Sequence, residues 1–159
     1  MSKSNSFWGA NFVELAQKKG FLVKKATSHE FSRFINFILV GKSADGKPQS
    51  VSVSLKPSLN KKGNLWAWIE IKNKKGKPGW LYGDAHFIVF EFSDCFYLIK
   101  RKDLLEYINV NVDFNSPIVQ HSWAAKYKLF QRPSHLDQIT KINLSKLNPD
   151  TVEFSIWKK

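Results

Sequence analysis

The sequence predicts a single mixed α/β domain, in which helices flank a central mixed β-sheet. Its 159 residues are enough for one domain with a hydrophobic core and too few for two domains of ordinary size. Hydrophobic residues make up 43% of the chain and aromatic residues 14%, which indicates an ordered globular protein. The apolar pattern runs from helix to strands, then to a second helix and further strands. This order is typical of helices packed around one sheet, so we expect residues 1–159 to form one domain.

The first predicted element is a helix at residues 5–19. Phe12, Leu15 and Ala16 form an apolar stripe at helical spacing, and Gly20 ends it. A turn with Asp45 in it separates two strands of a hairpin. The elements expected up to this hairpin's end are a short strand at 21–25, a helical turn at 27–33, and strands at 35–40 and 49–56.

A strand at residues 66–72 is the element on which the functional argument depends. Strict alternation places four side chains on one face: Trp66, Trp68, Glu70 and Lys72. The other face is apolar and is expected to be buried: Ala67, Ile69 and Ile71. The later predicted elements are strands at 80–82, 85–92 and 95–100, a helix from 101 to about 110, and strands at 139–144 and 151–157.

The net charge of +12 is the strongest global property of the chain. Together with a pI near 9.8, it favours a polyanionic partner such as nucleic acid. We expect no membrane attachment, because no apolar run reaches about 18 residues and the N-terminus lacks a secretory signal. The one cysteine, Cys95, excludes an internal disulfide and a cysteine-cluster zinc site. The sequence therefore predicts a cytoplasmic protein that binds nucleic acid.

Basic residues gather in two loops around residues 66–72 and in the segment 123–132, where they interleave with aromatic residues. Such segments suit phosphate contact combined with stacking on bases, although a solvated surface has the same composition. The predicted nucleic-acid contacts are Lys61, Lys62, Lys74, Lys75, Lys77, Lys126, Lys128 and Arg132.

Glu70 and Lys72 form a candidate catalytic pair. From Lys56 to Lys77 there are seven lysines and one acid, Glu70. A carboxylate that binds a divalent cation, with a lysine beside it, is what metal-dependent phosphodiester cleavage uses. The alternative is an exposed ion pair, which contributes about 0–1 kcal/mol.

A second acid is needed for such a site, and three candidates exist. Asp84 begins an apolar strand, Glu14 lies on the first helix, and Asp45 lies in the hairpin turn. Each has a structural alternative, as a turn residue or as an exposed helix acid. The four histidines lack metal-ligand spacing, so zinc is not expected.

The run from Asn36 to Ile108 resembles the small phage-type members of the PD-(D/E)XK nuclease superfamily. The matching features are a preceding helix with Glu14, the hairpin INFILV…SVSLK, the residues Gly63, Asn64 and Glu70, the GWL at 79–81, Asp84 before an alanine, and a closing LLEYI. The resemblance implies a restriction-endonuclease-like fold that binds Mg²⁺ or Mn²⁺ and cleaves phosphodiester bonds.

The resemblance leaves two positions open for the acid-x-lysine motif. In the first, Asn36 stands where the family has an acid and Ser54-Leu55-Lys56 stands for acid-x-lysine, so only Lys56 is kept. In the second, Glu70-Ile71-Lys72 is the motif, and Asp84, Glu14 or Asp45 is the missing acid. The expected metal ligands are then Glu70, Asp84 and Glu14.

Two classes of function follow. One is a magnesium-dependent endonuclease acting on double-stranded DNA, or a nicking enzyme if the protein is monomeric, with Glu70, Lys72, Asp84 and Lys56 as catalytic candidates. The other is a catalytically silent protein of the same fold that binds DNA or a host DNA-processing protein. A phage-encoded protein of either class would work in the host cytoplasm.

Overall fold

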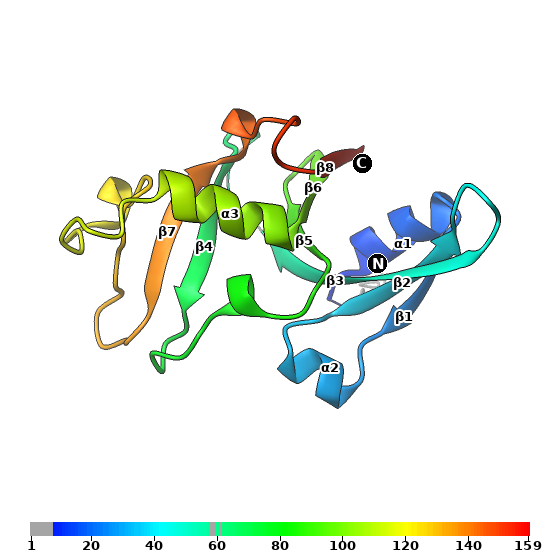
Figure 1. The fold of residues 1–159 in the computed structure, drawn as a ribbon, viewed down its shortest axis with the longest axis horizontal. Coiled ribbons are helices and arrows are strands. Elements are labelled where there is room, and N and C mark those ends of the chain that lie inside the picture. Colours follow the sequence, from blue (N-terminus) through cyan, green and yellow to red (C-terminus); the bar gives the residue numbers. More distant parts are fainter. Residues whose placement is uncertain (1–7, 58–59, 61) are drawn as a thin grey trace, which may run out of the picture.

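The computed structural model describes residues 8–57, 60 and 62–159. Within these residues the chain is a mixed α/β domain, as predicted, with a central six-stranded sheet (Figure 1). Only the β3–β5 pair in that sheet is parallel, and its other neighbouring strands are antiparallel. The strands, in spatial order, are β1 (Leu22–Lys25), β2 (Phe37–Lys42), β3 (Pro48–Pro57), β5 (Phe87–Glu91), β6 (Cys95–Lys100) and β8 (Phe154–Lys158).

The strand at Trp66–Lys72, β4, does not belong to this sheet. It pairs antiparallel with β7 (Gln138–Asn143) in a separate two-stranded sheet (Figure 1). The prediction of one sheet is therefore wrong at this point. The reason is burial, because the apolar face of β4 packs in the same core cluster as Ile88 and Ile99 of the central sheet. A strand that packs on a sheet face cannot also extend its hydrogen-bonded edge.

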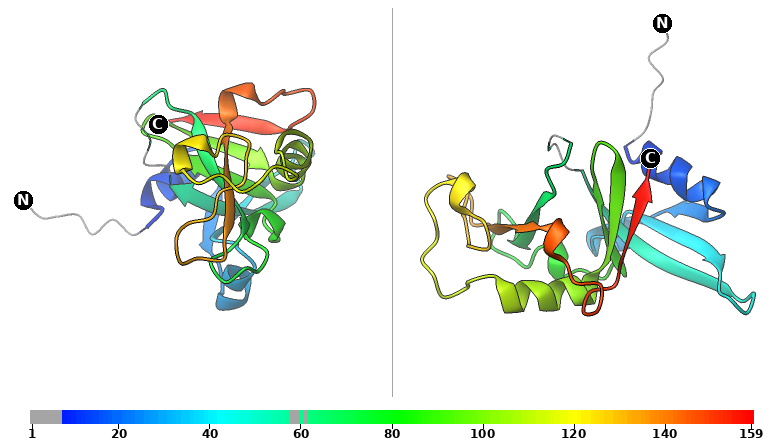
Figure 2. Two further views of the ribbon diagram at one scale, coloured as in Figure 1. Left: turned by 90° about the vertical axis from the view of Figure 1, so that its left-hand side faces the viewer. Right: turned by 90° about the horizontal axis from the view of Figure 1, so that it is seen from above.

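The helices lie on opposite faces of the central sheet. α1 (Ala10–Lys18) packs through Phe12 and Ala16 on one face, in a cluster with Val53 and Leu55 of β3. α3 (Arg101–Asn111) packs through Leu104 and other residues on the face that β4 and β7 also cover. The view from above in Figure 2 shows α1 and α3 on either side of the sheet. The short α2 (Ser28–Ser32) connects β1 to β2 and is held by a capping box between Thr27 and Glu30.

β3 divides its side chains between these two faces. Val53 and Leu55 point to the α1 side, whereas Ser52 and Ser54 alternate with them and are buried on the other side. The strand is longer than predicted by one residue at each end. Its last alternating residue on the serine side is Lys56, at the carboxyl end of the strand.

Residues 80–82 were predicted as a strand and instead form a short 3₁₀ helix, η1 (Trp80–Tyr82). The backbone turns because Tyr82 N–H donates to Gly79 O and Gly83 N–H donates to Trp80 O. The turn buries Trp80 and Leu81 in the core. Two further 3₁₀ turns are η2 (Ser122–Ala124) and η3 (Leu144–Lys146). Among the described helices, none is both long enough and apolar enough to span a bilayer.

Candidate functional site

Lys56 lies at the carboxyl end of β3, beside its parallel neighbour β5. Its ammonium sits over the ring of Trp80, 5.1 Å from the ring centroid. Burial lowers the pKa of Lys56 from 10.5 to about 8, and the nearby carboxylate of Glu70 opposes that shift. The carboxyl end of parallel strands is the usual place for a site in an α/β sheet.

Glu70 lies near Lys56 although it belongs to β4, in the other sheet, and its charge acts on the lysine. Its position is set by Gly79, where an added Cβ would lie 2.6 Å from Glu70 O and 2.8 Å from Glu70 Oε1. Only glycine leaves room for this contact. The two alternative motifs of the sequence thus meet in one place, since Lys56 belongs to the first and Glu70 to the second.

Asn36 and Ser54, the neutral residues of the first motif, lie next to Lys56. The Asn36 side chain accepts a hydrogen bond from Leu55 N–H at 2.7 Å, and its backbone N–H donates to Val53 O at 2.8 Å. Ser54 Oγ is fully buried and has no hydrogen-bond partner within the described structure. The site therefore combines one carboxylate, one lysine and two neutral side chains that each carry an oxygen atom.

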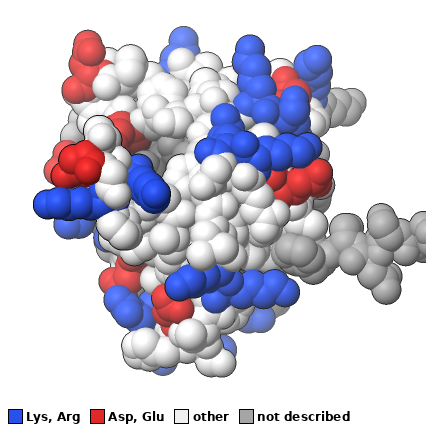
Figure 3. Space-filling view, turned by 90° about the vertical axis from the view of Figure 1, so that its right-hand side faces the viewer, with Lys and Arg blue, Asp and Glu red and all other residues white. Residues whose placement is uncertain are grey.

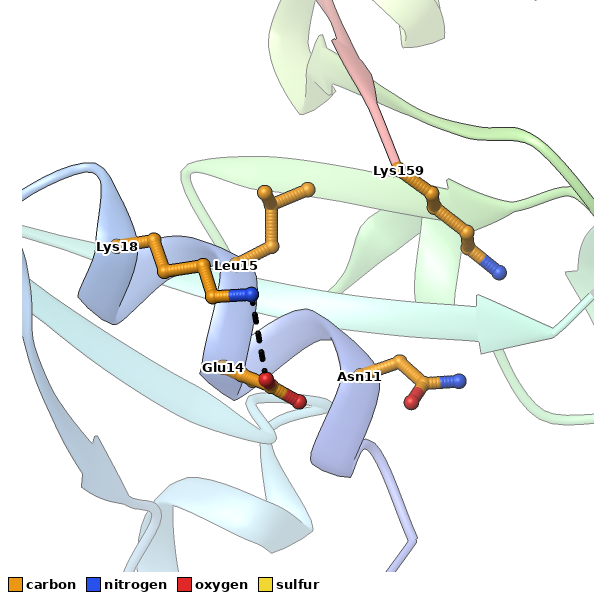
Figure 4. Close-up of a pocket in the computed structure, with 5 residues that line it drawn as sticks. All are labelled: Asn11, Glu14, Leu15, Lys18 and Lys159. Carbon is orange, nitrogen blue, oxygen red and sulfur yellow. Dashed lines mark ion pairs between the residues drawn. The ribbon is translucent and has the colours of Figure 1, made fainter.

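The other predicted metal ligands lie elsewhere. Glu14 is on α1, on the opposite face of the sheet from β4, and pairs with Lys18 at 3.3 Å beside Lys159 (Figure 4). Asp84 pairs with Arg33 at 2.6 Å, and this hydrogen bond and charge hold the pKa of Asp84 below its usual range. Asp45 accepts a hydrogen bond from Ser43 in the hairpin turn.

The donor set does not fit a Mg²⁺ site of the predicted composition. Mg²⁺ requires near-octahedral oxygen ligands, and its charge is offset by carboxylates. Of the predicted acids in the described residues, only Glu70 lies near Lys56. The ammonium of Lys56 is therefore a positive charge close to the one carboxylate that could bind the ion. In the described ranges, no three His, Cys, Asp or Glu side chains are grouped so that they could share a metal.

Lys72 is separated from Glu70 by a break in strand pairing. The pairing of β4 with β7 shifts register between Glu70 and Lys72, which indicates a β-bulge there. Lys72 is exposed, whereas Glu70 is half-buried. The lysine that shares surroundings with Glu70 is therefore Lys56.

The outward face of β4 and β7 carries aromatic and basic side chains that contact each other. Lys126 lies over Trp66 at 4.8 Å, and Lys141 lies over Trp68 at 5.1 Å from the ring centroids. Strand pairing sets Trp68 directly opposite Lys141. Phe130 packs against Trp68 with a centroid distance of 6.2 Å. We call this surface the aromatic–basic face; it consists of Trp66, Trp68, Lys126, Phe130, Arg132 and Lys141.

Arg132 is fixed at the edge of this face by a buried acid. Asp137 is fully buried, and its carboxylate accepts hydrogen bonds from Arg132 Nε at 2.5 Å and Arg132 N–H at 3.0 Å. The segment also binds the loop after β4, because Leu136 N–H donates to Lys74 O at 3.0 Å. The aromatic–basic face therefore continues into a basic loop.

The other predicted nucleic-acid contacts among the described residues are exposed lysines. Asn73 Oδ1 accepts the N–H groups of Lys75 and Lys77, which shapes the loop that displays them. Lys61 lies outside the described residues. Exposed lysines of the predicted set are Lys62, Lys74, Lys75, Lys77, Lys126 and Lys128.

The opposite end of the molecule has a different charge pattern. Figure 3 shows that there basic side chains alternate with acidic ones around a broad uncharged surface.

No family model, curated protein or solved structure matches this chain.

Sequence reasoning missed three residues of this region: Lys141, Asp137 and Trp80. A signal for Lys141 existed, because alternation in the predicted strand at 139–144 places it on the polar face. Asp137 and Trp80 act through contacts between distant segments, and their local sequence carries no signal of that.

Proposed function

We propose that the protein binds DNA through the aromatic–basic face. The observation that carries this proposal is the placement of Lys126 over Trp66 and of Lys141 over Trp68. Aromatic rings with adjacent cations offer stacking for bases and contacts for phosphates. The net charge of +12 supports the same partner.

The two lysines are also close enough to repel each other. Burial, and secondly the charge of Lys126, lower the pKa of Lys141. Folding therefore holds two ammonium groups near each other on a half-exposed surface. A bound phosphate would relieve that repulsion, which favours an anionic ligand at this position.

Removing the two lysines together tests the proposal. Lys126→Ala/Lys141→Ala should weaken binding to a fluorescent DNA oligonucleotide at least tenfold at 100 mM salt. The control is Lys24→Ala/Lys42→Ala, which removes the same charge from exposed positions on β1 and β2. Equal losses for both pairs would show that net charge, and not this face, determines affinity. No binding by the wild type at low salt would instead favour a host protein as the partner.

Metal-dependent cleavage of DNA by a nuclease-like fold is the second candidate function, and of the predicted acids that the structure describes only Glu70 would be near Lys56 to bind the metal. The observation in its favour is Lys56, a lysine with a pKa of about 8 beside Glu70 at the end of a parallel strand. Perturbed pKa values of this kind are common at active sites, and they also occur in structural pairs. Incubation of supercoiled plasmid with the protein and Mg²⁺ or Mn²⁺, against an EDTA control, decides between an active nuclease and a DNA-binding protein without cleavage. For either function we propose a cytoplasmic location, as the sequence predicts.

A further inference from the structure

An open cavity of about 540 Å³ lies beside the aromatic–basic face. Its lining includes three aromatic side chains, Trp68, Trp80 and Phe130, together with Ile139. Trp68 remains 40% exposed, so its surface is accessible to a ligand. The volume falls in the range of about 300–1,000 Å³ that is typical of small-molecule sites. The walls are suited to a flat aromatic group.

Two side chains of opposite charge, Glu70 and Arg132, line the same cavity. Each is held by a group behind it: Glu70 packs on Gly79, and Arg132 is bonded to the buried Asp137. Arg132 thus has its ion pair with Asp137 and not with Glu70. The cavity therefore presents a preorganised acceptor and a preorganised donor between aromatic walls.

These two groups define the edge pattern of a matching ligand. A carboxylate accepts two parallel N–H bonds, and an arginine side chain donates to adjacent acceptors. Guanine has N1–H and N2–H₂ donors on one edge and O6 and N7 acceptors on another, and arginine commonly reads O6 and N7. Thymine has one N–H between two carbonyl oxygens, which would face the Glu70 carboxylate unfavourably. The base must be unpaired, because pairing in a duplex occupies the donor edge.

We propose that this cavity binds an unpaired guanine of single-stranded DNA, stacked against Trp68, with Glu70 accepting from its N1–H and N2–H₂ and Arg132 donating to O6 and N7. The inference rests on the proposed DNA-binding function and adds a base-specific pocket to it. It also gives Glu70 a role that requires no metal.

The test compares a fluorescent dT12 strand with the same strand carrying one central guanine. Wild type should bind the guanine strand about tenfold more tightly. It should also bind that strand more tightly than the duplex made by annealing its complement. The preference for guanine over thymine should disappear in Glu70→Gln, which keeps the shape and removes the charge, and in Trp68→Ala.

Trp123→Ala is the matched control. Trp123 is 71% exposed and is not part of the cavity lining, so its loss should leave the guanine preference unchanged. Equal binding of both strands by wild type, or tighter binding of the duplex, would overturn the pocket while leaving DNA binding intact. A guanine preference retained in both Glu70→Gln and Trp68→Ala would also overturn it. If the wild type binds none of these DNA strands, the proposed function itself is refuted. Failure of the guanine pocket and failure of DNA binding therefore give different results.

Discussion

Glu70 of β4 and Lys56 of β3 lie beside each other although they belong to different sheets. The two charges interact electrostatically because β4 packs on the central sheet and brings Glu70 toward the carboxyl end of β3. Trp80 and Gly79, from the turn that follows β4, support the lysine and the acid respectively. One turn therefore positions both charged groups.

Replacing Lys56 with Met should stabilise the protein at pH 7. A lysine whose pKa falls from 10.5 to about 8 on folding loses about 3 kcal/mol of folding free energy while it stays charged. Since the folded pKa lies below the unfolded one, this cost is full below pH 8 and is relieved as the pH rises to about 10.5. We expect Lys56→Met to raise the free energy of unfolding by about 1–3 kcal/mol at pH 7 and by little at pH 10.

Urea denaturation followed by circular dichroism at the two pH values measures this difference. A variant that is less stable than wild type at pH 7 would show that the Lys56–Glu70 interaction outweighs the burial of the ammonium.

Gly79→Ala should destabilise the fold. The added Cβ would lie 2.6 Å from a backbone oxygen of Glu70, and a backbone atom cannot move aside as a flexible side chain can. The expected loss in free energy of unfolding is about 1–3 kcal/mol. Gly41→Ala is the control, because its Cβ meets only the ring of Phe21. Thermal unfolding of both variants should give the lower midpoint for Gly79→Ala, and a reversed order would contradict the packing argument.

DNA affinity should depend steeply on salt. If the aromatic–basic face and its loop neutralise about five phosphates, the logarithm of the association constant should fall with the logarithm of salt concentration at a slope of about −4 to −5. Lys75→Ala removes one exposed lysine and should reduce the slope by about one. Fluorescence anisotropy across a salt series gives both slopes. A flat dependence would exclude electrostatic binding to the backbone.

Cleavage, if it occurs, should depend on Lys56 and Glu70 more than on Lys72. Lys56→Ala and Glu70→Gln should each lower the rate of plasmid nicking by about two to three powers of ten, since a positioned charge stabilises the transition state. Lys72→Ala should change it little, because the β-bulge separates Lys72 from Glu70. Agarose gels of plasmid incubated with Mg²⁺ report the rates. The opposite ranking would assign the reaction to the exposed pair of β4.

Much of the fold was predictable because it depends on local periodicity. The alternation of β4 predicts its buried residues Ala67, Ile69 and Ile71, and all three are buried. The grouping of Trp66, Trp68 and Glu70 on one face follows from the same pattern and is confirmed, since the register shift comes after Glu70. The capping box at Thr27 and Glu30 is likewise a local signal.

The sequence by itself determined most of the elements, the buried face of β4 and the strong positive charge, because these depend on neighbouring residues and on composition. Tertiary structure alone decided that β4 leaves the central sheet, that Glu70 lies near Lys56, and that Asp137 holds Arg132. Each of these depends on packing between segments that are distant along the chain. Alternation specifies which face of a strand is buried, but the free energy of burial is nearly the same for any apolar surface that covers it. The surface on which β4 packs is therefore determined by how all the elements of the chain pack together.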